Sequence, residues 1–200
     1  MNLPNRLTLL RVVLVPVSMI FLLFPIGGAF WARIIAAAVF GITSFTDMLD
    51  GKIARKYGLI TNFGKFMDPL ADKFMVFGVL VSMCASDMYA PEAYPFFRPL
   101  LVFVTVIVIF RELAVTSMRL LAASSSDSIV IAANWAGKVK TVSQIIFILC
   151  MILEPCAAEL IGIPNYSVLS FASMAFMTFM TVYSGINYLF AYRKYIDFTH

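Results

Sequence analysis

The residues of this sequence best suited to chemistry are four aspartates at the ends of two apolar segments, Asp47, Asp50, Asp68 and Asp72. Carboxylates at such positions are costly unless they face a wet cavity or a cation. Placed together, they would repel one another and take up protons. Hard divalent cations suit all-oxygen ligands and often complete their coordination shell with substrate phosphates. The aspartates therefore predict a metal site that acts on a phosphate-bearing substrate.

The spacing of the aspartates would bring them to one point if both segments are helical. At 100° per residue, Asp47 and Asp50 fall within an arc of about 100° on one helix. Asp68 and Asp72 are one turn apart on the next helix. Two helices joined by a short turn pack as antiparallel neighbours, so we expect the two aspartate pairs to surround one small volume.

Small residues lie on the same helical faces as these aspartates. Gly51 and Ala54 share the face of the first pair, and Gly64 precedes the second pair by one turn. Without a large side chain, a nucleotide or a diphosphate can approach the backbone closely. The neighbouring Arg55 offers a planar guanidinium to an anion.

An alternative is an interfacial charge network, in which the aspartates only form ion pairs with nearby cations. Four aspartates and no glutamate, interleaved with small residues, are an unusual composition for a solvated surface, and this favours the metal site. The cations available for such a network are Lys52, Arg55, Lys56, Lys65 and Lys73.

A second group of charges follows in the chain. Arg111 and Arg119 lie in an apolar segment, about 12 Å apart along a helix axis. Lys138 and Lys140 stand at the start of the next apolar run. Because buried cations need an anion, we expect these four residues to bind a phosphate-bearing ligand. Alternatively, Arg111 pairs with Glu112 and only holds the helices together, while the other cations reach the membrane interface.

The composition requires a membrane to accommodate these segments. The sequence is 62% hydrophobic and 13% charged, with a mean hydropathy of +0.92, well above the usage of soluble domains. Several apolar runs approach the roughly 20 residues that cross a bilayer as a helix. The alternating segments of a membrane β-barrel are absent. We therefore predict a single all-α, polytopic domain over residues 1–200, with six transmembrane helices near 9–25, 29–48, 66–86, 99–121, 139–154 and 167–191.

The charges also predict an orientation. Six spans place both termini on one side, and the basic residues collect on that side. By the positive-inside rule, the termini and the aspartate site are expected in the cytoplasm. The net charge of +4 then reflects topology and attraction to membrane lipids, and no nucleic-acid partner is expected. The basic residues are Arg6, Arg11, Lys52, Arg55, Lys56, Lys65, Lys73, Lys138, Lys140, Arg193 and Lys194, against Arg33 and Arg98 on the opposite side.

In full, the aspartate segment resembles the signature of the CDP-alcohol phosphotransferase family. Every defining position is matched, and the resemblance extends over nearly the whole chain. It implies a six-helix membrane fold, a CDP-activated lipid as substrate and a homodimer. The matching residues read Asp47-x2-Asp50-Gly51-x2-Ala54-Arg55-x8-Gly64-x3-Asp68-x3-Asp72.

Three further stretches are similar to the bacterial branch of this family that makes phosphatidylglycerophosphate. This similarity implies CDP-diacylglycerol as donor, glycerol 3-phosphate as acceptor and a place in the bacterial cell (inner) membrane. The stretches are Asn2-Leu3-Pro4-Asn5-x-Leu7-Thr8-x2-Arg11, Asp68-Pro69-Leu70-Ala71-Asp72-Lys73, and Arg111-Glu112 with Arg119 and Gly137-Lys138-x-Lys140-Thr141.

The family resemblance also implies roles for the site residues. Two Mg²⁺ or Mn²⁺ ions would be held by Asp47, Asp50, Asp68 and Asp72. Asp72, the fourth aspartate, would also act as general base towards the acceptor hydroxyl. Contacts with the CDP-lipid are implied for Asp47, Asp50, Gly51, Ala54, Arg55, Gly64 and Asp68.

Other functions are compatible with parts of this pattern. The same transfer to inositol phosphate, serine or another alcohol would use the same aspartates, although the cations favour a phosphorylated acceptor. Charges within membrane helices also occur in secondary transporters and cation channels. Here they cluster near one side of the membrane and form no path across it. A membrane scaffold would leave the aspartate spacing without a cause.

Overall fold

The chain folds into helices in every element that can be described, as the sequence predicts. The computed structural model describes residues 2–57, 61–86, 95–124 and 135–193; within these, the side chains of residues 3, 4, 50–57, 65 and 122–124 are not described. No strand occurs in these ranges. The helices are α1 (Leu3–Leu23), α2 (Ala29–Tyr57), α3 (Asn62–Ala85), α4 (Phe97–Ser124), α5 (Trp135–Ile161) and α6 (Val168–Tyr192).

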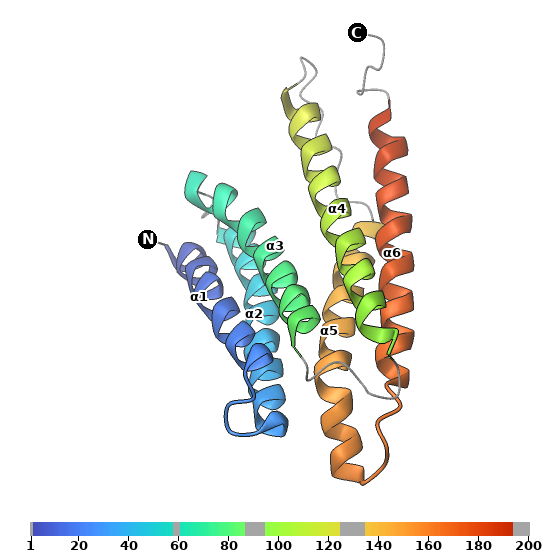
Figure 1. Cartoon of the computed structure of the whole chain (residues 1–200). Helices are drawn as coiled ribbons and strands as arrows, with labels where there is room; N and C mark the ends of the chain where they lie inside the picture. The colour runs from blue at the N-terminus through green and yellow to red at the C-terminus, as the bar shows by residue number, and fades with distance from the viewer. Residues whose placement is uncertain (1, 58–60, 87–94, 125–134, 194–200) are drawn as a thin grey trace.

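The six helices form two groups of three that follow the order of the chain (Figure 1). Helix α1 packs against α2 and α3, while α6 packs against α4 and α5. Contacts of α2 with α5 and of α3 with α4 join the two groups. The start of α1 and the end of α6 lie toward the same end of the bundle, as expected for an even number of alternating helices.

Five of these helices are long and apolar enough to cross a membrane, namely α1, α2, α4, α5 and α6. Helix α3 does not qualify, so the predicted number of six spans is not confirmed. The reason lies in its charges: Asp68, Asp72 and Lys73 leave only Phe74–Ala85 as an uninterrupted apolar stretch. That stretch is roughly 18 Å long, against about 30 Å of hydrocarbon in a bilayer. The candidate site residues Asp68 and Asp72 therefore shorten the apolar length of α3.

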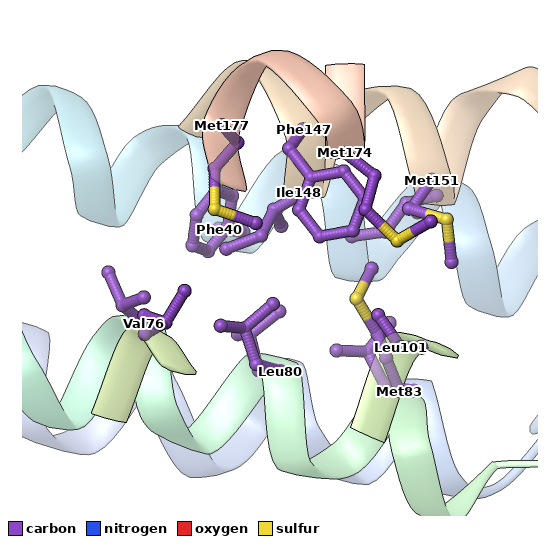
Figure 2. Packing of buried hydrophobic residues seen from close by; sticks show 14 of the residues in the cluster. Phe40, Val76, Leu80, Met83, Leu101, Phe147, Ile148, Met151, Met174 and Met177 are labelled. Atoms are coloured by element: carbon purple, nitrogen blue, oxygen red, sulfur yellow. The ribbon is translucent and has the colours of Figure 1, made fainter. Parts of the chain in front are cut away.

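A core of apolar side chains holds all six helices together. Figure 2 shows Phe40 of α2, Leu80 of α3 and Ile148 of α5 pointing toward one another, and all three are at most 1% exposed. Large apolar residues such as Trp31, Phe103 and Phe110 are instead exposed on the outside. This combination of an apolar core and an apolar exterior suits a bundle surrounded by lipid.

The helices at the aspartate end are longer than the sequence predicts. Helix α1 begins at Leu3, where the side chain of Asn2 caps it by accepting a hydrogen bond from the N–H of Asn5 (3.3 Å). Helix α2 continues to Tyr57, and α3 already starts at Asn62. The whole aspartate segment except its short connection is therefore helical.

Helix α5 differs most from the prediction of a short helix ending at residue 154. It begins at Trp135 and runs to Ile161. The polar Glu154 does not end the helix because its carboxylate turns to the start of α6. There it accepts hydrogen bonds from the N–H groups of Leu169 (2.8 Å) and Ser170 (2.7 Å) and from the hydroxyl of Ser170 (2.5 Å).

Candidate active site

The first described aspartate of the motif, Asp47, forms an ion pair with Arg11 of α1. The side chain of Arg11 is fully buried, whereas that of Asp47 remains about one third exposed, at 35%. A buried guanidinium needs a counter-charge, and Asp47 supplies it while keeping access to solvent. Arg11, part of the opening family resemblance, thus belongs to the aspartate site.

Asp68 is held by the same face of α1. The hydroxyl of Thr8 donates a hydrogen bond to Asp68 Oδ1 at 2.7 Å, and Thr8 is only 1% exposed. Thr8 and Arg11 are three residues apart, so they share one side of their helix. Helix α1 therefore positions Asp47 of α2 and Asp68 of α3 against a single surface.

Gly64 lies where α1 and α3 meet. A Cβ atom there would stand 3.2 Å from Asn5 Oδ1 and 3.3 Å from Thr61 Oγ1. Thr61 caps α3 by accepting a hydrogen bond from the Gly64 N–H, and its hydroxyl donates to Asn5 Oδ1 (both 3.0 Å). Close packing against these two side chains thus favours glycine at this position. A role for Gly64 in nucleotide binding stays a prediction.

Asp72 connects the aspartate site with the second group of charges. The charges of Asp47 and Arg11, and also those of Lys140 and Glu112, act on its carboxylate. Asp72 also lines a small pocket between α3, α4 and α5, together with Glu112, Lys140 and others. The fourth aspartate is therefore coupled electrostatically to residues of both groups.

Two of the predicted phosphate-binding cations meet at Glu112. Lys140 forms an ion pair with Glu112 Oε1, and Arg111 Nη1 donates to the same oxygen at 3.0 Å. Arg111 Nη2 also donates to Ser184 Oγ of α6 at 2.5 Å. The pairing of Arg111 with Glu112, considered above as the alternative, is therefore present. Arg111 Nε, however, is buried without a hydrogen-bond partner among the described residues.

Arg119 joins this group through an aromatic ring. Its Nη2 donates to the hydroxyl of Tyr188 at 2.6 Å, and the guanidinium carbons of Arg119 and Arg111 stand 5.1 and 5.5 Å from the centre of the Tyr188 ring. Tyr188 thus holds two guanidinium groups close to its ring, at distances suited to cation–π attraction. Lys138 is exposed and lies apart from the buried Lys140.

The sequence analysis did not identify the buried polar side chains of α6, or Gln144, as neighbours of the second group of charges. The signal for α6 was a row of polar side chains at helical spacing within an apolar run, all of them buried: Thr181, Ser184, Tyr188 and Tyr192. Such a row indicates a face turned to polar partners. For Gln144, which is 1% exposed, the signal was its spacing of four residues from Lys140.

The remaining motif residues lie outside the described side chains. This applies to Asp50, Gly51, Ala54 and Arg55, which are helical residues of α2. Among the described side chains alone, no group of three or more His, Cys, Asp or Glu residues could hold a metal ion. The chemistry of the available donors, carboxylates with solvent access at Asp47 and Asp68, nevertheless fits a hard divalent cation.

Comparisons with known proteins identify the family of the chain. The family model of the CDP-alcohol phosphatidyltransferases matches residues 1–184. A CDP-diacylglycerol–glycerol-3-phosphate 3-phosphatidyltransferase of Bacillus subtilis (strain 168) is 38% identical, covering 94% of this chain and 93% of the relative. Proteins of the same name from Rickettsia felis, 32% identical over 97% of both chains, and Salmonella typhimurium, 31% identical over 96% and 95%, also match. With its aspartate motif, helical bundle and near-complete coverage, the chain belongs to the CDP-alcohol phosphatidyltransferase family.

Proposed function

We propose that this protein transfers the phosphatidyl group of CDP-diacylglycerol to glycerol 3-phosphate, giving phosphatidylglycerophosphate and CMP. The observation that carries the proposal is the position of Asp72, which lies near Asp47 and also shares a pocket with Lys140 and Glu112. A general base for this transfer must reach the acceptor hydroxyl beside the donor diphosphate. The names of the relatives provide the identity of the two substrates.

The donor half of the proposed site is built on α1, α2 and α3. Asp47, Asp50, Asp68 and Asp72 would hold two divalent ions, Mg²⁺ or Mn²⁺, which would neutralise charge on the diphosphate and on the departing CMP. Arg11 and Thr8 keep Asp47 and Asp68 on one face of α1. The remaining residues of the motif would contact the CDP-lipid, namely Gly51, Ala54, Arg55 and Gly64.

The acceptor half is built on α4, α5 and α6. Arg111 and Lys140, with Arg119 and Lys138 as further cations, would bind the phosphate of glycerol 3-phosphate. Arg111 Nε is a buried donor without a described partner, as expected of a group that meets its anion in the substrate. Glu112 balances one of the two positive charges of Arg111 and Lys140, which leaves one positive charge for the phosphate.

In the reaction, Asp72 takes the proton of the acceptor hydroxyl as that oxygen attacks the lipid-bearing β-phosphorus. A new phosphorus–oxygen bond forms, the bond between the β-phosphorus and the bridging oxygen breaks, and CMP leaves with that oxygen. No covalent intermediate on the protein is required.

The first test is CMP release by the purified protein in detergent with CDP-diacylglycerol and Mg²⁺ or Mn²⁺. Glycerol 3-phosphate, inositol phosphate, serine and no acceptor are compared. We expect release only with glycerol 3-phosphate. Release with another alcohol would overturn the acceptor assignment, and no release with any acceptor would overturn the enzymatic function itself. A transporter would instead show substrate flux in liposomes.

Location and assembly belong to the same proposal. We place the protein in the bacterial inner membrane, with both termini and the aspartate site in the cytoplasm. The distribution of basic residues supports this orientation. A homodimer is implied by the family resemblance, and mass determination by light scattering in detergent tests it.

A further inference from the structure

The pocket beside Asp72 contains a polar group that the proposed reaction has not used, the carboxamide of Gln144. Gln144 is 1% exposed, and its Nε2 atom is buried without a hydrogen-bond partner among the described residues. Buried amide groups are nearly always paired, because an unpaired one loses the hydrogen bonds that water would provide. Gln144 also lines the pocket. Its donor group is therefore positioned to meet a polar atom that enters this pocket.

The geometry of the pocket indicates which part of a ligand would reach Gln144. Lys140 and Gln144 are one helical turn apart on α5, about 6 Å along the axis. Facing them on α3 are Asp72 and, one turn further into the bundle, Val76. Gln144 is thus one turn further along α5 than the charged Lys140, as Val76 is one turn further along α3 than Asp72. It contributes a neutral hydrogen-bonding group to a pocket that these charged residues also line.

An acceptor alcohol bound here has three polar parts to satisfy. Its phosphate would be attracted to the cations around Glu112, and its reacting hydroxyl must lie near Asp72. The remaining hydroxyl of a glycerol unit then needs a partner at a position that the charged residues leave open. Gln144 Nε2 is a neutral donor suited to a hydroxyl oxygen.

We propose that Gln144 is a specificity-determining residue, which donates a hydrogen bond from Nε2 to the non-reacting hydroxyl of the acceptor. The inference rests on the proposed function and adds the means by which the enzyme recognises a polyol phosphate. Sites that hydrogen-bond a substrate hydroxyl discriminate strongly against the analogue that lacks it, because the polar group of the site is then left unpaired.

The test compares two acceptors, glycerol 3-phosphate and 3-hydroxypropyl phosphate, which lacks only the middle hydroxyl. For the wild-type protein we expect kcat/KM to favour glycerol 3-phosphate. In Gln144→Met, which keeps the length of the side chain but has no donor, we expect this preference to fall by at least about tenfold. The change should arise from a lower kcat/KM for glycerol 3-phosphate, and the KM for CDP-diacylglycerol should not change.

A matched control separates recognition from packing. Ser143 is the neighbour of Gln144 on α5 and is 2% exposed. Its hydroxyl, however, already donates a hydrogen bond to the Lys140 carbonyl at 2.7 Å. Ser143→Ala should therefore lower thermal stability and leave the acceptor preference unchanged. Gln144→Met should change the preference without lowering the stability, since it removes an unpaired buried donor.

The outcomes distinguish this inference from the proposed function. An unchanged acceptor preference in Gln144→Met, with an active wild-type protein, would overturn the role of Gln144 alone. A preference that shifts equally in Ser143→Ala would assign the effect to packing and overturn the inference too. A wild-type protein that uses neither acceptor would instead refute the proposed function.

Discussion

At the scale of single residues, Asp72 is the side chain on which both halves of the proposed site depend. Asp72→Asn keeps the shape and removes the base, so we expect CMP release to fall roughly 10²- to 10⁴-fold. The protein should remain folded and bind the nucleotide lipid. CMP release and lipid binding, measured on the same preparation, check this.

A suitable control for Asp72→Asn is Glu159→Gln, because Glu159 is exposed near the far end of α5. It undergoes the same change of carboxylate to amide and should retain full activity. Full activity in Asp72→Asn would contradict the assigned role of the base.

Thr8 gives a second prediction at the same scale, concerning stability. Thr8→Val removes the hydrogen bond to Asp68 while keeping the shape of the buried side chain. Because the carboxylate of Asp68 is exposed and can be rehydrated, we expect a loss of about 0.5–1.5 kcal/mol in the free energy of unfolding. Thermal unfolding in detergent measures it, and Thr8→Ser, which keeps the hydroxyl, should lose less. Equal melting temperatures for wild type and Thr8→Val would show that the bond contributes nothing.

The sequence indicated candidate residues for the site but not their contacts. Charged residues in apolar runs are visible in a sequence because they are costly there, and this identified Asp47, Asp72 and Arg111. Their partners are set by tertiary packing. Nothing in the spacing indicates that Arg11 pairs with Asp47 or that Tyr188 contacts two arginines, since the partners come from different helices.

At the scale of the helices, Glu154 joins α5 to α6. Ser167, which precedes α6, has a positive φ of 51° and makes no side-chain capping bond, so Glu154 satisfies the first N–H groups of α6 instead. We expect Glu154→Ala to destabilise the protein by about 0.5–2 kcal/mol, the usual effect of losing a cap. Activity should be preserved, because Glu154 lies about 21 Å along the helix from Lys140.

Thermal unfolding and CMP release on Glu154→Ala, with Glu159→Ala as the matched variant on the same helix, test this role. A stability equal to that of Glu159→Ala would show that α6 begins without help from Glu154.

The order of the helices was predicted from the sequence. The residues at which they begin and end were not. Apolar runs mark where a helix can lie in a membrane, but a helix continues into polar sequence as long as its end groups find partners. This explains why α2 extends through the aspartate motif to Tyr57 and why α5 passes Glu154. It also explains why the span predicted for α3 is not confirmed, since α3 is helical but too polar to qualify as a span.

At the scale of the whole molecule, the orientation in the membrane can be tested directly. Asn62 is exposed at the aspartate end of the bundle, and Ile163 is exposed in the connection between α5 and α6. In a variant without native cysteines, we expect Ile163→Cys to react with an impermeant maleimide on spheroplasts. Asn62→Cys should react only after the membrane is permeabilised. The reverse labelling pattern would contradict the cytoplasmic placement of the site.

On the proposed function, the division of the bundle into two groups of three helices would separate two tasks between two parts of one chain. Residues that would bind the CDP-lipid lie on α2 and α3 and are positioned by α1, whereas those that would bind the acceptor lie on α4 and α5 and are contacted by α6. Substitutions in the second part can therefore change the alcohol that is used without disturbing the activated lipid. Chimeras that keep the first three helices and exchange the last three offer a route to new phospholipid headgroups.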